Sequence, residues 1–85
     1  MAEWPTWWNW DFEVSPHALK RMAERDFTEL DLRRMLDIAQ TVASDIVPGP
    51  WRVLTRLRRR LWEIIVEPDA DAQHLVVITA YPLDK

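Results

Sequence analysis

The N-terminal part of the chain alternates apolar and polar residues, and the pattern changes to a helical spacing at Ser15. The apolar positions of the alternation are Trp8, Trp10, Phe12 and Val14. Strict alternation is typical of a half-buried strand, because successive side chains of a strand point to opposite faces. Ser15 can cap a helix, and Pro16 suits the first helical position, where a missing N–H costs nothing. We therefore predict a strand followed by a helix from Pro16 to Arg25.

A second helix is predicted to begin at Thr28 and to end near Gln40. Asp31 follows Thr28 by three residues, which is the spacing of a capping box. The helix carries an apolar stripe at the i, i+3, i+4, i+7 spacing, formed by Leu32, Met35, Leu36 and Ala39. The segment Thr41–Val47 is predicted to be a short extended edge, and Pro48-Gly49-Pro50 then interrupts regular structure.

Three further strands are predicted over residues 51–57, 61–67 and 75–81. The first two form a hairpin, and its turn lacks Gly and Asn, so we expect a four-residue loop through Arg60 rather than a two-residue turn. The register places the apolar residues on one face, namely Trp51, Val53, Thr55, Leu57, Trp62, Ile64 and Val66. The other face carries Arg52 and Arg56 together with apolar residues and glutamates.

The last strand is apolar on both sides, so it is predicted to be central in the sheet. If Val76, Ile78 and Ala80 face the helices, Thr79 and Tyr81 share the open face with the arginines. The expected fold is α+β, with two N-terminal helices packed on one face of a small antiparallel sheet. We expect a Trp-rich N-terminal segment over residues 1–11 and a single domain over residues 12–85.

The composition is that of a small globular protein. The chain has 85 residues, of which 48% are apolar and 29% are charged. It contains no apolar run of membrane-spanning length, no basic start and apolar stretch of a signal peptide, and no cysteine. We therefore expect a cytoplasmic protein without membrane contact, disulfides or thiolate metal sites.

Basic residues gather in one window although the formal net charge is −3. The window contains Arg52, Arg56, Arg58, Arg59 and Arg60, with no acidic residue before Glu63. A local basic patch can hold a phosphate backbone even on an acidic protein. The alternative is a solvated hairpin tip that protects the sheet from edge-to-edge association.

His17 and Arg21 lie one helical turn apart, so a titratable imidazole is held next to a permanent cation. Metal-free RNA cleavage needs a base for the ribose 2′-OH, cations for the phosphate and an acid for the leaving oxygen. An imidazole suits the acid or base role, two arginines (Arg52 and Arg56) can clamp phosphate, and Tyr81 can orient the substrate or donate a proton. The structural alternatives are ion pairs of these arginines with nearby acids and a tyrosine that closes the sheet.

No metal site or cofactor is expected, because the two histidines lack partners at ligand spacing and Gly49 is the only glycine. Four tryptophans crowd the N-terminal segment, namely Trp4, Trp7, Trp8 and Trp10. They predict a docking surface for a partner or a second copy, or stacking against single-stranded RNA. The alternative is a segment that closes over the core.

Two stretches resemble the domain-of-unknown-function family 4258. The first is Ser15-Pro16-His17-Ala18-Leu19-Lys20-Arg21-Met22 with Arg25 and Phe27-Thr28-Glu29, and the last is Val77-Ile78-Thr79-Ala80-Tyr81-Pro82. Trp51-Arg52-Val53 resembles the middle strand of that family, and the resemblance spans about residues 12–83. One departure is Asp26, which stands where the family usually has Gly after the first helix.

The resemblance implies a compact α+β domain with a RelE/BrnT-like fold, related to metal-free ribonucleases that are often paired with an antitoxin. It places His17, Arg21, Arg52, Thr79 and Tyr81 at the polar motif positions. Our leading hypothesis is a toxin-like ribonuclease in which His17, Arg21, Arg52 and Tyr81 are catalytic. RNA would be bound by Arg25, Arg56, Arg58, Arg59, Arg60 and Thr79. One alternative is a non-catalytic protein-binding or dimerisation module that uses the tryptophans, and another is a nucleic-acid binder that retains the fold without chemistry.

Overall fold

The computed structural model describes residues 5–44 and 49–83. In these ranges the elements are a short 3-10 helix η1 (Thr6–Asn9), β1 (Asp11–Val14), α1 (Pro16–Arg25), α2 (Glu29–Asp37), β2 (Thr41–Ser44), β3 (Trp51–Leu57), β4 (Arg60–Asp69) and β5 (His74–Pro82). Both predicted helices and the strands after them are present, and the α+β class is confirmed. The strand predicted from the alternation at Trp8, Trp10, Phe12 and Val14 covers only Asp11–Val14, because Thr6–Asn9 form η1 instead. The predicted edge over Thr41–Val47 is a strand as far as Ser44, and the rest of it lies outside the described residues.

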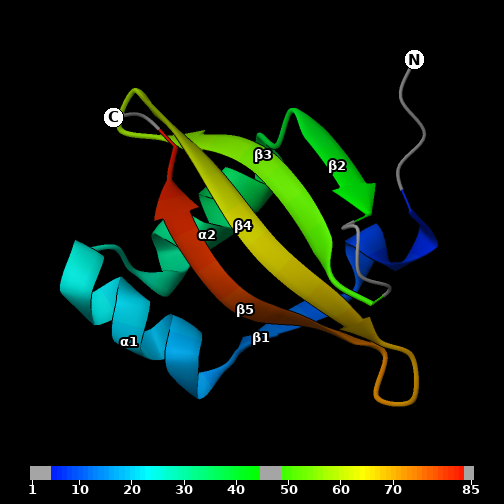
Figure 1. The fold of residues 1–85 in the computed structure, drawn as a ribbon. Helices are drawn as coiled ribbons and strands as arrows, with labels where there is room; N and C mark the ends of the chain where they lie inside the picture. The colour runs from blue at the N-terminus through cyan, green and yellow to red at the C-terminus, as the bar shows by residue number, and fades with distance from the viewer. Residues whose placement is uncertain (1–4, 45–48, 84–85) are drawn as a thin grey trace.

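The strands form one sheet in the order β1-β5-β4-β3-β2 (Figure 1). Neighbours pair antiparallel except β1 and β5, which run parallel. The prediction of an antiparallel sheet is therefore wrong for β1. The alternation over residues 8–14 indicates a strand but not the direction of its neighbour. Most of the chain lies between β1 and β5, so no tight turn forces them to be antiparallel.

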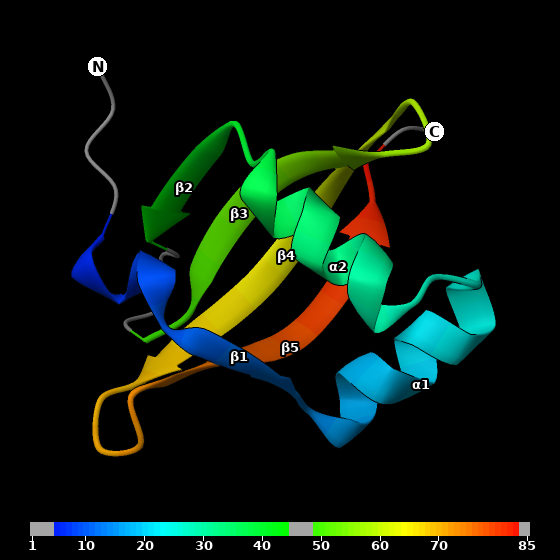
Figure 2. The same cartoon turned by 180° about the vertical axis from the view of Figure 1, so that it is seen from behind.

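Helix α2 lies across one face of the sheet, as Figure 2 shows. Its side chains Leu32 and Met35 are fully buried against the sheet, whose core residues include Val53 and Ile64. The hydroxyl of Thr55 donates a hydrogen bond of 2.5 Å to the carbonyl of Met35. That carbonyl belongs to the last turn of α2, where carbonyls lack helical partners, so the buried threonine satisfies it.

Helix α1 lies beside β5, beyond the end of β1 (Figures 1 and 2). The backbone N–H of Ser15 donates to the carbonyl of Val77 at 3.0 Å, and the Ser15 hydroxyl donates to the carbonyl of Ile78 at 3.0 Å. At the other end of the helix, Arg25 Nη1 donates to the carbonyl of Ala80 at 3.3 Å. The helix therefore covers a strand edge that would otherwise expose unpaired carbonyls.

An irregularity between β4 and β5 reverses part of the predicted face assignment. Ile65 pairs with Thr79, whereas Val66 pairs with Val77, so Ile78 is an extra residue at a register shift. As a result Leu75, Val77 and Ala80 are the buried residues of β5, and the prediction that Val76 and Ile78 face the helices is wrong. One inserted residue changes the parity of the strand, which alternation alone does not reveal.

The β3–β4 hairpin has the two-residue turn that we did not expect. Leu57 pairs with Arg60, and the intervening Arg58 and Arg59 have φ of 53° and 69°. Two successive residues in the left-handed conformation destabilise a turn unless they are Gly or Asn. The Arg58 guanidinium donates to the carbonyl of Asp26 at 2.9 Å, which anchors the turn to the end of α1. This tertiary contact explains why the sequence of the turn misled the prediction.

The C-terminus of α1 offers a stabilising substitution. Asp26 takes the left-handed conformation (φ 58°, ψ 54°), and its N–H bonds to the carbonyl of Met22. Glycine reaches this conformation without a Cβ penalty. We expect Asp26→Gly to raise the free energy of unfolding by roughly 0.5–1 kcal/mol, measured by urea denaturation. Asp37→Gly is the control, because Asp37 is helical and glycine there is expected to lower the free energy of unfolding. If both substitutions lower the free energy of unfolding, the left-handed conformation of Asp26 is not a source of strain.

Candidate nucleic-acid interface on the open sheet face

The face of the sheet opposite α2 carries the polar side chains that the sequence singled out. The strand registers align them in two rows, Arg52–Ile65–Thr79 and Leu54–Glu63–Tyr81. Arg52 and Arg56 lie on either side of Leu54 on β3. The prediction that Thr79 and Tyr81 share a face with these two arginines therefore agrees with the pairing, despite the irregularity in β5.

Tyr81 and Glu63 form a hydrogen-bonded pair on this face, near the end of β5. The Tyr81 hydroxyl donates to Oε1 of Glu63, and both residues are partly buried. A carboxylate joined to a phenol can accept a proton at one oxygen while the phenol donates one. Glu63 was not among our predicted site residues. The alternation along β4 already placed it on the open face, and its contact with Tyr81 depends on strand pairing.

Arg52 and Arg56 are exposed, and within the described ranges neither takes part in an ion pair. Pairing with Glu63 or Glu67, the structural alternative for these two arginines, is not seen. Each of the two arginines lies two residues from Leu54 on β3, which is about 7 Å along the strand and within reach of a long side chain. Both guanidinium groups can therefore bind one anion that lies over Leu54.

His17 and Arg21 lie at the border of this face. His17 is exposed on the first turn of α1, and Ser15 ties that turn to Ile78 of β5. Strands β5 and β4 separate it from Arg52 on β3, which corresponds to about 14 Å between backbones. Arg21 donates to Glu24 at 2.5 Å and thereby lowers the pKa of that carboxyl. The structure thus shows the structural alternative for Arg21, an ion pair on its own helix.

The other predicted RNA-binding arginines are Arg25, Arg58, Arg59 and Arg60, and they differ in their contacts. Arg25 is bonded to β5, as described above, and Arg58 also approaches Asp31 at 3.4 Å. The pKa of Asp31 is lowered, first by the N–H of Thr28 in the capping box and less by the charge of Arg58. Arg59 and Arg60 are exposed at the hairpin tip. Arg25 and Arg58 therefore contribute contacts that hold the fold together.

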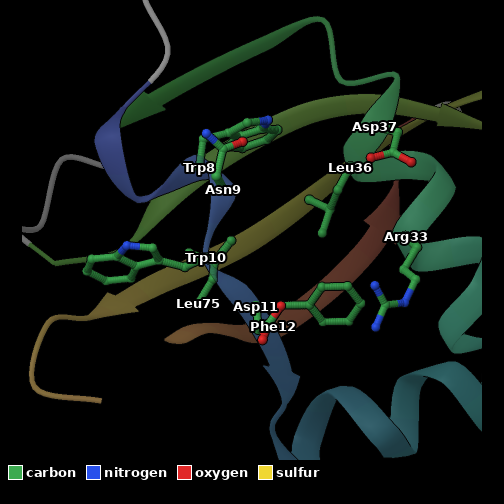
Figure 3. A pocket seen from close by; sticks show the side chains of 9 residues that line it. All are labelled: Trp8, Asn9, Trp10, Asp11, Phe12, Arg33, Leu36, Asp37 and Leu75. Carbon is green, nitrogen blue, oxygen red and sulfur yellow. The ribbon is translucent and has the colours of Figure 1, made fainter. Parts of the chain in front are cut away.

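The tryptophans of the N-terminal segment differ in burial. Trp7 is 9% exposed and meets Trp51 edge-on, with 5.3 Å between ring centroids. Trp8 and Trp10 are half-buried and line a cavity beside α2 (Figure 3). Trp4 lies outside the described residues. The core-closing interpretation therefore accounts for Trp7, whereas Trp8 and Trp10 keep accessible surface.

Two negative findings apply to residues 5–44 and 49–83. No helix there is long and apolar enough to cross a membrane. In the same ranges, no three His, Asp or Glu side chains gather into a group that could hold a metal ion. The chemically active groups that the open face presents include two arginines, a tyrosine and a glutamate.

The fold and the site define a small α+β domain whose mixed sheet is covered by α2 on one face. The other face carries Arg52 and Arg56, which form no ion pair with any residue that the structure describes. The chain belongs to the family described as Domain of unknown function (DUF4258), whose model matches residues 14–82. This confirms the family resemblance seen in the sequence. A search of curated proteins found no match to the chain. A search of solved structures found none either.

Proposed function

We propose that the protein is a toxin-like, metal-independent endoribonuclease that binds single-stranded RNA on the open sheet face. The observation that carries the proposal is the arrangement of Arg52 and Arg56 around the hydrogen-bonded pair of Tyr81 and Glu63. Two cations that have no ion-pair partner among residues 5–44 and 49–83 lie near a carboxylate and a phenol, and together these groups supply charge stabilisation and proton transfer. The DUF4258 membership and the α+β fold are compatible with a RelE/BrnT-like relation.

A phosphate over Leu54 is the geometry that best uses these groups. Leu54 lies between the two arginines on β3 and in the same row as Glu63. Each guanidinium can approach the phosphate from one side and neutralise the charge that builds up on its oxygens. The ribose next to that phosphate then lies toward β4 and β5, where the carboxylate and the phenol are.

The reaction is a transesterification in which the ribose attacks its own phosphate. The Glu63 carboxylate takes the proton of the 2′-OH, and the 2′ oxygen forms a bond to phosphorus. The bond from phosphorus to the 5′ oxygen breaks, and Tyr81 gives that oxygen its proton. The proton on Glu63 then returns to Tyr81 along their hydrogen bond. The products are a 2′,3′-cyclic phosphate and a 5′-hydroxyl, and both protein groups are regenerated.

His17 takes a different part in this proposal from the one that the sequence indicated. Two strands separate it from Arg52, so it contacts the RNA away from the cleaved phosphate. The bound RNA continues past Thr79 on β5 and past Arg59 and Arg60 at the hairpin tip. For a toxin-like ribonuclease we expect a cytoplasmic location and a cognate antitoxin protein as partner.

Salt dependence tests the phosphate contacts. Each phosphate contact to single-stranded RNA releases a counterion and contributes about −0.7 to the slope of log K against log salt. We expect the Arg52→Ala, Arg56→Ala double variant to reduce the magnitude of this slope by about 1.4. Fluorescence anisotropy with a labelled oligouridylate measures it. The Arg33→Ala, Arg34→Ala double variant, which removes two exposed arginines of α2, is the matched control and should leave the slope unchanged.

Cleavage itself is tested with purified protein and a single-stranded RNA in the presence of EDTA. We expect products that end in a cyclic phosphate, and we expect the double arginine variant to form them far more slowly. In bacteria the wild-type protein should slow growth more than this variant. If wild-type protein binds RNA but leaves it intact under all conditions, the ribonuclease proposal fails and the open face is a binding surface only.

A further inference from the structure

Strand β1 forms one edge of the sheet within the described residues, and its outer side has no strand neighbour there. The Ser15 N–H points inward to the carbonyl of Val77. Because backbone direction alternates along a strand, the N–H and C=O groups of Phe12 and Val14 point outward. Such a row of backbone groups is a template for an added strand.

A cavity opens beside this edge on the side of α2 (Figure 3). Its volume is about 260 Å³. Aromatic and aliphatic residues, including Trp8, Trp10, Phe12 and Leu36, line it together with the polar residues Asn9, Asp11, Arg33 and Asp37. The guanidinium of Arg33 lies 5.1 Å from the centre of the Phe12 ring and bounds the cavity at one end. The space is sufficient for one large apolar side chain.

The charges along β1 indicate what would lie next to that apolar side chain. Asp11 and Glu13 alternate with Phe12, and both are exposed. Glu13 has a long contact of 4.0 Å with His74, and Asp37 adds a further carboxylate at the cavity. Residues of an added strand that sit opposite Asp11 and Glu13 are stabilised by positive charge and destabilised by negative charge.

We propose that the outer edge of β1 binds an extended segment of a partner protein in which apolar residues alternate with Lys or Arg. The backbone of the segment pairs with Phe12 and Val14, one apolar side chain fills the cavity, and basic side chains lie next to Asp11 and Glu13. The proposal is independent of ribonuclease activity on the open face. A second copy is a poorer occupant, because antiparallel pairing of two β1 edges sets carboxylates against carboxylates.

The test uses the full chain and disulfide-closed β-hairpin peptides, whose free edge strand is already ordered. One hairpin carries Lys-Leu-Lys-Leu-Lys on its free edge, a second has Glu in place of Lys, and a third has Ser in place of Leu. Calorimetric titration gives the affinities, and amide hydrogen exchange reports on Phe12 and Val14. We expect the first hairpin to bind about tenfold more tightly than either of the others, and to slow exchange at both residues.

Charge reversal at the edge provides the decisive comparison. In the Asp11→Lys, Glu13→Lys double variant we expect the preference to change to the Glu hairpin. The Glu24→Lys, Asp71→Lys double variant makes the same charge change elsewhere and should keep the original preference. Circular dichroism checks that both variants fold. Equal binding of all three hairpins, or binding without slowed exchange at Phe12, overturns the proposal. Slowed exchange that accompanies self-association of the protein assigns the edge to a second copy and also overturns it.

Discussion

Replacing Tyr81 by Phe is expected to lower the rate of RNA cleavage by roughly 10²–10⁴-fold, the usual contribution of a general acid. The ring keeps its place on β5, so only the hydroxyl that donates to Glu63 is lost. Leaving-group protonation then depends on water. Single-turnover cleavage of a defined RNA measures the loss, and binding of the same RNA should change little because the arginines remain.

Glu63→Gln tests the other half of the pair. The amide keeps the shape of the side chain but does not accept the 2′-OH proton, so we expect a loss of similar size. Glu67→Gln is the matched control, because it is an exposed glutamate of the same strand whose loss should leave the rate within about twofold. If Tyr81→Phe cleaves at the full rate while His17→Ala is inactive, the acid–base role belongs to α1 and our assignment is wrong.

The sequence predicted the elements well because each has a strong local signal. Ser15 accepts from the N–H of Ala18, and Thr28 forms its capping box with Asp31. Alternation along β3 and β4 placed Arg52 and Arg56 on the uncovered face, since no residue is inserted between those strands. Local signals of this kind depend on neighbours in the chain, and the long-range bond from Ser15 to Ile78 supports the helix start rather than opposing it.

The failures of prediction arise from contacts between distant residues. The extra residue at Ile78 changes the parity of β5, and the parallel pairing of β1 depends on a strand about sixty positions later. At the site, the i, i+4 spacing put His17 beside Arg21, but Glu24 at i+3 holds the guanidinium. Glu63 was overlooked because its contact with Tyr81 exists only once β4 and β5 are paired in this register.

The second large effect concerns stability and the Trp-rich segment. Trp7 belongs to the hydrophobic core although it precedes the residues matched by the family model. We expect Trp7→Ala to lower the free energy of unfolding by about 3 kcal/mol, because it removes a buried indole and its edge-on contact with Trp51. Guanidinium denaturation followed by circular dichroism measures the change.

Trp10→Ala is the matched control for this prediction, because Trp10 is only half-buried and should cost less than half as much. A domain of this size has about 5–15 kcal/mol of stability, so the loss at Trp7 removes a substantial part of it. If Trp7→Ala leaves stability unchanged but abolishes association with a partner, the indole is a docking group rather than a core residue. A loss of about 3 kcal/mol would instead show that η1 is an integral part of the domain. This helix closes the core through Trp7 and places Trp8 and Trp10 at the cavity beside the edge of β1.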